Sequence, residues 1–436
     1  MMRYQEHQRL AGIPSRHPKW VEGMPLKRES GLDRWFFRWW EKGSAPRNEE
    51  EAELKDHSSG YYASYVIGAQ WLDEQESLVI TPKVGCDRID FLRLFSGCLQ
   101  SGIEAKEFSK IYEIDLNQPR IKAPELQSVL SPLIIVHFLS VVREVLRAGL
   151  KKDYVQREEN LKKVKGHIAI LRHERTNVLR KRPDKVYCRY QEYSVDIPEN
   201  RLLKKALIFS RQILSALPQG ESRASLEHAL HQCLSAFAHV GDEIEMSELK
   251  HFKYQKLFRT YSEAIRLAQI ILRRYDYSLT NIESKEEACP VFWLDMSLLF
   301  EHYVLGLLRE AYGDKIEYQA MGHTGRPDFI CHDPLLVMDA KYIPRFNGEG
   351  KINSYIIRQL SGYARDYKLF GKHPSQLIPC LVIYPKLGKA ENPFLGKGIK
   401  DLLLEKEKEV WDFYRFAVPL PTLGEEHGEG GLTLHK

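Results

Sequence analysis

Apolar and polar residues follow two different periods along this chain, and the period changes from segment to segment. Between Tyr61 and about Asn117, short stretches alternate with a period of two and are separated by turn-forming residues, which predicts a small β-rich domain. Further along, apolar residues recur at spacings of three and four, which predicts a helical middle region. Its helices are expected at Ser131–Leu150, Glu199–Leu217, Leu226–Val240 and Arg259–Arg274.

The last third of the chain changes repeatedly between helical and strand-like segments. The order is a helix at Phe292–Gly313, three strands, a second helix at Ser354–Phe370 and a further apolar strand, with a late strand-like segment after it. This order predicts an α/β (α+β) fold in which helices flank a mixed sheet. The predicted strands are Lys315–Ala320, Pro327–Cys331, Leu335–Ile343, Gln376–Lys386 and Trp411–Leu420.

At 436 residues the chain is too long for one ordinary core, so we expect several domains. The patterns divide it into an N-terminal extension (1–60), a β-rich domain (61–130), a helical and basic middle region (131–285) and a C-terminal domain (286–436). The extension contains RWFFRWWEK, from Arg34 to Lys42. For these aromatic residues, packing on another domain or subunit is favoured over stacking on nucleic-acid bases.

The composition adds limits to this outline. A hydrophobic fraction of 43% with 28% charged residues is typical of a soluble globular protein, and a formal charge of +5 permits contact with a polyanion without requiring it. No run approaches the roughly 18 to 20 apolar residues of a membrane helix, and the first residues lack a signal-peptide core, so we expect a cytoplasmic protein with no membrane contact. Seven scattered cysteines predict buried, reduced thiols and no structural zinc.

Candidate chemistry is concentrated between Arg326 and Tyr342, where two strand-like runs are joined by His332-Asp333-Pro334. This join predicts a tight turn and therefore a β-hairpin. If the turn is centred between Asp333 and Pro334, Asp328 lies opposite Asp339, and Lys341 shares the face of Asp339. Opposed carboxylates about 5 Å apart repel each other unless a cation lies between them. The hairpin therefore predicts a metal site.

A third carboxylate, Glu301, lies within an apolar stripe on the preceding helix, formed by Leu294, Leu298, Leu305 and Leu308. Oxygen ligands of this kind suit Mg²⁺, which commonly takes one or two carboxylates and accepts phosphate oxygens. We expect Asp328 and Asp339 to bind Mg²⁺, with Glu301 assisting directly or through water. Lys341 would position or activate the attacking water and help to neutralise the phosphate.

Two further sets of residues are candidates for contact with nucleic acid. Between Lys162 and Arg189 the chain has ten Lys or Arg residues against two acids. This composition is consistent with a solvated basic face and equally with a phosphate-binding surface. The candidates there are Lys162, Lys163, Lys165, Arg180, Lys181 and Arg182. On the helix after the hairpin, Gln359 and Tyr363 share a polar and aromatic face that suits a nucleic-acid backbone, although core packing of the tyrosine is equally natural.

The motifs GRPDF and MDAKY resemble the active-site signature of PD-(D/E)xK nucleases, with Asp339 in place of the commoner Glu. The Gln359 to Tyr363 spacing looks like an additional motif of some members. Together with the ordered stretches ITPKVG, VKGHI, YCRYQEYSVDIPENRLLKKAL, LDMSLLFEHYV and LVIYP, they resemble the McrC family, the nuclease subunits of modified-cytosine restriction systems. The chain departs from the family at Gly166-His167, where Gly-Arg is common, and in the first sixty residues, which have no family counterpart.

The resemblance implies a restriction-endonuclease-like C-terminal domain that hydrolyses double-stranded, modified DNA with Mg²⁺. It also implies a GTP-hydrolysing AAA+ partner ring like McrB, contacted by the amino-terminal part of the chain, here the β-rich domain. Asp328, Asp339 and Lys341 match the catalytic motif, and Glu301 matches the helix acid. The sequence has no GxxxxGK[ST] phosphate loop, so GTP hydrolysis is expected from another chain.

Two alternatives stay open at this point. One is a self-sufficient PD-(D/E)xK nuclease that needs no motor. The other is a non-catalytic adaptor that binds DNA through the basic segment or docks on a ring. Cleavage of both DNA strands needs two hydrolytic events, and two copies could meet as a homodimer or by collision of complexes on DNA.

Overall fold

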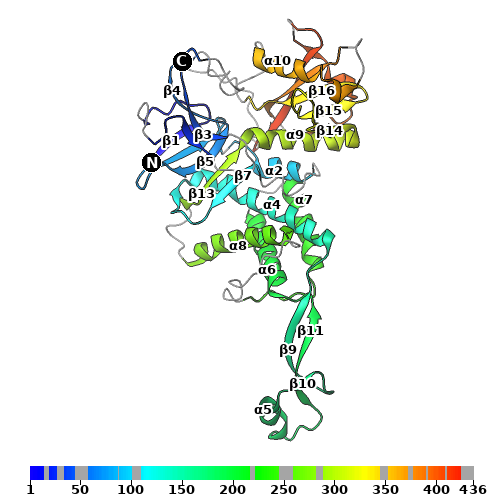
Figure 1. Ribbon diagram of the computed structural model, residues 1–436. Helices are drawn as coiled ribbons and strands as arrows, with labels where there is room; N and C mark the ends of the chain where they lie inside the picture. Colours follow the sequence, from blue (N-terminus) through cyan, green and yellow to red (C-terminus); the bar gives the residue numbers. More distant parts are fainter. Residues whose placement is uncertain are drawn as a thin grey trace. The chain divides into compact units, whose positions relative to one another are not determined.

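The computed structural model describes residues 1–13, 19–26, 34–44, 57–86, 88–100, 110–216, 221–244, 259–280, 288–343, 352–371, 377–388, 391–407 and 410–423. The chain forms two compact units (Figure 1). Unit 1 combines Met1–His137 with Ile282–Lys436, and unit 2 is Phe138–Asn281. This division differs from the four predicted segments, because strands from both ends of the chain share one sheet in unit 1.

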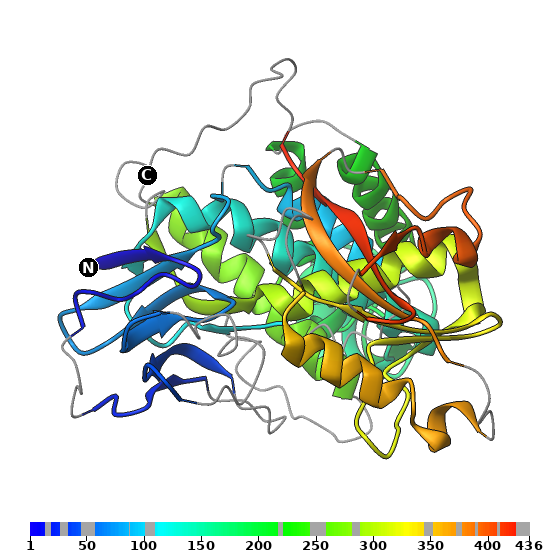
Figure 2. The same cartoon turned by 90° about the horizontal axis from the view of Figure 1, so that it is seen from above.

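Unit 1 contains the mixed sheet that the last third of the sequence predicts, and this prediction is confirmed. Its six strands are ordered β14 (Ile316–Tyr318), β15 (Phe329–His332), β16 (Leu335–Ala340), β17 (Cys380–Gly388), β19 (Phe413–Pro421) and β18 (Glu405–Lys406). β16, β17 and β19 run parallel to one another, and the other neighbours are antiparallel. Figure 2 shows β17 and β19, in orange and red, side by side.

Helices cover this sheet because its central strands are apolar on both faces. α10 (Ser354–Tyr363) packs Ile356 and Leu360 onto Val382 and Phe413. α9 (Met296–Tyr312) contacts β14 and β16, and the sheet lies between these two helices in Figure 1. α2 (Phe91–Gln100) contacts both α9 and β19. The remaining short elements are η5 (Gly313–Lys315), α11 (Tyr367–Phe370) and η6 (Ile399–Leu402).

A second, five-stranded sheet joins distant segments of unit 1. Its order is β1 (Met2–Gln5), β6 (Ser77–Thr81), β5 (Val66–Trp71), β13 (Val291–Asp295) and β7 (Tyr112–Asp115). Here the predicted helix from Phe292 is wrong at its start, since the chain is a buried strand as far as Asp295. A continuous apolar run with Val, Phe and Trp suits a strand buried on both faces as well as it suits a helix. The Asp295 side chain then accepts a hydrogen bond from the Leu298 amide and starts α9.

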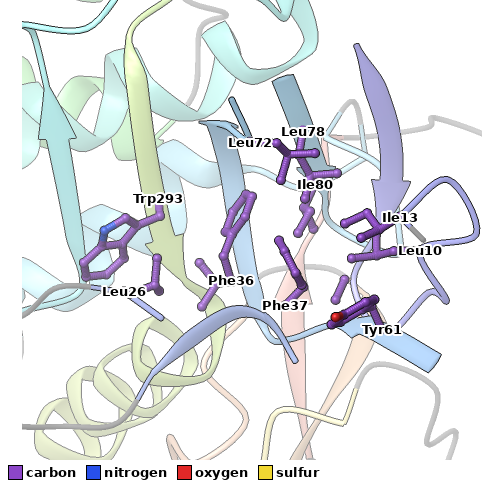
Figure 3. Close-up of a cluster of buried hydrophobic side chains, with 12 residues drawn as sticks. Leu10, Ile13, Leu26, Phe36, Phe37, Tyr61, Leu72, Leu78, Ile80 and Trp293 are labelled. Carbon is purple, nitrogen blue, oxygen red and sulfur yellow. The ribbon is translucent and has the colours of Figure 1, made fainter. Parts of the chain in front are cut away.

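The first sixty residues are part of the same core. β2 (Gly23–Pro25), β3 (Trp35–Trp40) and β4 (Gly60–Ala63) form a three-stranded sheet. Phe36 and Phe37 on β3 are fully buried, and Figure 3 shows them in one cluster with Ile80 and Trp293. These aromatic residues pack within protein and not on bases, as expected, but they do so in the core of their own unit and not on another domain or subunit. Since β1 also completes the five-stranded sheet, this segment is an integral part of unit 1 and not a separate extension.

Unit 2 is built from helices and one long ribbon. α6 (Pro198–Ala216) packs against α7 (Glu221–Ala236) and α8 (Arg259–Thr280), as predicted. β9 (Asp153–Leu161) and β11 (Val186–Ser194) pair over nine residues and extend away from α6 (Figure 1). Between them lie β10 (His167–Ile168), α5 (Ile170–His173) and η2 (Glu174–Val178). The basic segment is therefore the tip of a β9–β11 arm, which the sequence did not predict.

One helix has the length and composition to cross a membrane. It comprises η1 (Pro124–Leu126) and α4 (Gln127–Ala148), has a mean hydropathy of 1.9 over its most apolar window, and belongs partly to each unit. In the folded chain 72% of that window is buried, as in a core helix. β8 (Ile121–Lys122) precedes it and pairs with β12 (Ala288–Cys289). All seven cysteines are buried and not disulfide-bonded, as predicted.

Candidate active site

The hairpin forms with the predicted register. Phe329 lies opposite Met338 and His332 opposite Leu335, so the turn is centred between Asp333 and Pro334. One residue further from the turn, this register sets Asp328 opposite Asp339. The Ala340 amide donates a hydrogen bond of 2.8 Å to Oδ2 of Asp328, which holds this carboxylate at the end of β16. Turn chemistry and alternation were sufficient to place the two acids together.

Asp339 and Lys341 are buried side by side. Their exposed fractions are 1% and 7%, and Nζ of Lys341 forms an ion pair with Oδ2 of Asp339. The Lys341 amide still donates to the Ile383 carbonyl at 2.8 Å, so the backbone stays in the sheet beyond the end of β16. A buried charge is costly unless it is paired, and each of these two charges satisfies the other. The prediction that they share one face is confirmed.

Three carboxylates influence one another at this place. Burial raises the pKa of Asp328 well above its usual range, the negative charges of Asp339 and Glu301 raise it further, and Lys341 lowers it. Burial also raises the pKa of Glu301, and the charge of Asp339 adds to this effect. The predicted catalytic residues of α9 and of the hairpin are thus brought into electrostatic contact. Negative charges held this close favour a bound cation or a proton.

Glu301 has partners that sequence reasoning missed. Its Oε1 atom accepts hydrogen bonds of 2.9 Å from the Tyr318 hydroxyl and from Nε2 of Gln319. Both donors lower the pKa of Glu301 and thus oppose the effect of burial. They lie at and just beyond β14, and no spacing in the sequence connects them to a residue on α9. They orient the acid relative to the hairpin.

The helix after the hairpin also reaches the site. Nε2 of Gln359 donates to the Tyr363 hydroxyl at 3.1 Å. Burial raises the pKa of Tyr363, the Gln359 hydrogen bond lowers it, and the charges of Asp339 and Lys341 act on it in opposite directions. Oε1 of Gln359 is buried without a hydrogen-bond partner among the residues that the structure describes. The predicted helix to Phe370 is broken, however, because α10 ends at Tyr363 and Asp366 starts the separate helix α11.

The loop before Asp328 is hydrogen-bonded to Asp366, which lies between α10 and α11. Asp366 accepts hydrogen bonds from the amide and the hydroxyl of Thr324, at 2.6 and 2.8 Å. Burial alone would raise the pKa of Asp366, but these bonds and one from the Lys368 amide lower it to about 2. Gly325 has a φ of +142°, and a Cβ there would lie 2.8 Å from the Tyr363 ring. Asp366 is the N-cap of α11, and neither this role nor its loop partner was predicted from the sequence, which indicated one continuous helix.

The donor set for a metal is small. Across the described ranges, no three His, Cys, Asp or Glu side chains are placed to hold one ion together. Asp328 and Asp339 remain, and hard carboxylate oxygens in this number match the one or two that Mg²⁺ commonly takes beside water and phosphate oxygens. The pKa of Asp328 is raised first by burial and then by the charges of Asp339 and Glu301, and a divalent cation would remove that repulsion. The residues present therefore fit Mg²⁺, and the charge of Glu301 also acts on Asp328.

The predicted basic residues belong to unit 2, whereas the carboxylates of the site belong to unit 1. They are exposed at the tip of the β9–β11 arm: Lys162, Lys163, Lys165, Arg180, Lys181 and Arg182. Lys165 also has local partners, since its Nζ lies 3.2 Å from Glu192 and 3.9 Å from the Tyr190 ring centroid. Large apolar side chains are exposed among these charges, including Leu171 and Leu179 at 74% and 77%.

Comparison with known proteins gives a consistent family match. The family described as "McrBC 5-methylcytosine restriction system component" matches residues 63–385, which include the hairpin, α9, α10 and the arm. No curated protein matches the chain.

Solved structures give weaker likenesses. One is a half-complex from a tetradecameric assembly of Thermococcus gammatolerans McrB AAA+ hexamers with bound McrC, with 16% identity, a TM-score of 0.34, and 96% of this chain and 94% of that chain covered. Another is the Thermococcus gammatolerans McrBC complex, with 14% identity, a TM-score of 0.30, and 70% and 86% covered. These scores are too low to transfer structural detail.

Proposed function

Because the chain belongs to the family of McrBC 5-methylcytosine restriction system components, we propose that it is the Mg²⁺-dependent DNA endonuclease subunit of a modification-dependent restriction complex. The observation that carries this proposal is the buried Asp339–Lys341 ion pair beside Asp328 at the end of the hairpin. A structural hairpin would gain little by burying two acids and a lysine, since apolar residues of similar size are often neutral or stabilising there. Hydrolytic chemistry gives a reason to retain them.

Each residue has a distinct part in this proposal. Asp328 and Asp339 would hold Mg²⁺, which when bound stabilises the negative charge of the phosphate and makes water more acidic. Lys341 positions or activates the attacking water and offsets the charge that develops on the phosphate. Glu301 assists directly or through water, and the hydrogen bonds from Tyr318 and Gln319 to its Oε1 orient it. Gln359 would contact the DNA backbone next to the scissile bond, and Tyr363, which is buried against Ile330 and Val337, would support Gln359 through its hydroxyl.

The arm would serve binding rather than hydrolysis. Its exposed lysines and arginines suit the phosphates of double-stranded DNA, and such contacts position a protein without reading sequence. The exposed apolar residues among them are typical of a surface that contacts protein.

For the partner we propose a GTP-hydrolysing AAA+ ring like the McrB hexamers named in the Thermococcus structure. Family membership supports this partnership, and the expected substrate is DNA that carries a modified cytosine. Cutting both strands then brings two copies of the chain together, as a homodimer or through pairing of complexes on one DNA molecule.

The test uses the full chain with methylated DNA and Mg²⁺, with and without the GTPase partner and GTP. We expect cleavage by the wild type, and its loss in Asp339→Asn and Lys341→Ala. Asp333→Asn is the matched control, because it removes an exposed acid from the turn of the same hairpin. Cleavage without partner or GTP would identify a self-sufficient nuclease. Full cleavage by Asp339→Asn would refute the site, and normal protection of cells by this variant would indicate an adaptor.

A further inference from the structure

Glu6 is a fully buried carboxyl group in the N-terminal part of unit 1. It follows β1 directly, its amide donates to the Thr81 carbonyl at 3.0 Å, and its exposed fraction is 0%. Oε2 accepts hydrogen bonds of 3.2 Å from the Tyr342 hydroxyl and the Lys83 amide, while Oε1 has no hydrogen-bond partner within the described part of the chain. Burying a carboxyl group costs stability unless it is hydrogen-bonded, so the bonds that Glu6 makes matter to this part of the fold.

Its partner Tyr342 lies next to Lys341. β16 ends at Ala340, and the Lys341 amide makes a further ladder bond to Ile383. Tyr342 is itself 2% exposed. Its hydroxyl donates a hydrogen bond to Glu6, which is 336 residues away in the chain. The side chain of Tyr342 therefore anchors the backbone just where the strand that carries the catalytic motif ends.

The ring of Tyr342 also touches the helix that carries the third acid. Its centroid lies 6.1 Å from that of Phe300, the residue before Glu301 on α9, and 5.8 Å from that of Tyr65. Aromatic pairs at such distances contribute stability beyond simple burial. Tyr342 thus follows Lys341 directly in the chain, and its ring packs on the residue before Glu301. It connects two residues that reach the site from different elements.

We propose that Tyr342, held in place by Glu6, is a positioning residue that fixes the Lys341 ammonium relative to Glu301 and the two hairpin aspartates. The inference rests on the proposed nuclease function and adds a role for residues outside its motifs. Misplacement of a catalytic group by about 1 Å costs on the order of 100-fold in rate. Loss of the Glu6–Tyr342 bond frees the end of the strand at Lys341 without removing any group that touches the substrate.

Glu6 offers a matched pair of substitutions. Burial raises the pKa of Glu6 well above its usual range, the Tyr342 hydroxyl lowers it, and the Asp295 carboxylate raises it. An amide is close in shape to a carboxyl group, so Glu6→Gln keeps an oxygen that accepts from Tyr342 and Lys83. Glu6→Ala removes the acceptor altogether. For the hydroxyl, Tyr342→Phe is the minimal change, and Tyr112→Phe is its control, because it removes a buried hydroxyl bonded to His137 elsewhere in unit 1.

The experiment measures steady-state cleavage by the full chain with its GTPase partner, and amide hydrogen exchange of the full chain without Mg²⁺. We expect Tyr342→Phe and Glu6→Ala to lower kcat by about 10- to 100-fold with KM for DNA unchanged, whereas Glu6→Gln and Tyr112→Phe stay within about threefold of wild type. Exchange in peptides that cover Leu336 to Ile343 should become faster in the first two variants only. The double variant Glu6→Ala/Tyr342→Phe should be no slower than the slower single variant.

Asp339→Asn separates the two proposals. If it is inactive while Tyr342→Phe and Glu6→Ala cleave like Tyr112→Phe, the positioning role is refuted and the nuclease function stands. If Asp339→Asn cleaves normally, the nuclease assignment itself fails. Equal loss of kcat in Glu6→Gln and Glu6→Ala would also overturn the role of the accepting oxygen. Should Glu6→Ala fail to fold, Tyr342→Phe and Glu6→Gln still decide the question.

Discussion

The hairpin that carries Asp328, Asp339 and Lys341 and the tip of the β9–β11 arm both concentrate charged residues, but they place them in opposite surroundings. At the hairpin, Asp339 and Lys341 are buried and paired, and the pKa of Asp328 is raised by burial and by neighbouring acids. At the tip, most of the lysines and arginines between Lys162 and Arg189 are exposed. Charges interact strongly where water is excluded. Between exposed charges, salt screens the interaction over about 10 Å. The hairpin therefore suits chemistry, and the tip suits association.

The largest effect is expected from removing the buried lysine. Lys341→Ala leaves Asp339 buried without its counter-charge, so the free energy of unfolding should fall by about 3 kcal/mol. Cleavage should fall by a factor on the order of 10³. Lys163→Ala, at the exposed tip, is the matched control and should change stability by less than about 0.5 kcal/mol. Denaturant unfolding and DNA cleavage measure both variants, and equal stability losses would contradict the contrast.

A second prediction concerns the tip. The triple substitution of Arg180, Lys181 and Arg182 by Ala should weaken DNA binding and reduce the slope of log affinity against log salt by up to about 2.7. Cleavage at saturating DNA should stay unchanged, since these residues do not belong to the proposed hydrolytic site. Fluorescence anisotropy at several salt concentrations measures the slope, with Arg211→Ala on the exposed face of α6 as control. An unchanged slope together with weakened binding of the GTPase would assign the tip to the partner.

A third prediction concerns the base of the arm, which is held by paired charges as the hairpin is. Arg201 lowers the pKa of Asp196 to about 2, against the effect of burial, and Arg157 also contributes. Because the folded pKa lies below the unfolded value, this stabilisation is present above about pH 4 and is lost as the pH falls toward 2. Asp196→Asn should cost about 2 kcal/mol at pH 7. In unfolding experiments the difference from wild type should shrink between pH 4 and 2, and a constant difference would refute it.

The smallest effect is expected at the loop that precedes Asp328. Thr324→Val removes the hydroxyl that donates to Asp366 but keeps the amide hydrogen bond, so we expect a loss of about 1 kcal/mol in unfolding free energy. Cleavage should fall by only a few-fold, because the loop remains attached. Thr324→Ser retains the hydroxyl and should behave like wild type. If both variants lose stability equally, the hydroxyl is not the stabilising group.

The sequence by itself determined the features that depend on neighbouring residues. The turn at Asp333-Pro334 and the alternation along both strands fixed the register that brings Asp328 and Asp339 together. Helical spacing placed the helices of unit 2 and the part of α9 that carries Glu301. Such features are encoded locally, because a turn type and a repeat of two or 3.6 residues act within a few positions of one another.

Only the tertiary structure decided which distant segments meet. Nothing in the spacing of residues connects Glu6 to Tyr342 or Gln319 to Glu301. The apolar run at β13 was compatible with a helix, and it became a strand because β5 and β7 pair with both of its edges. The aromatic residues of β3 are part of the core because Trp293 and other residues of the five-stranded sheet pack against them. Long-range pairing depends on the shape and burial of whole surfaces, which no local period records.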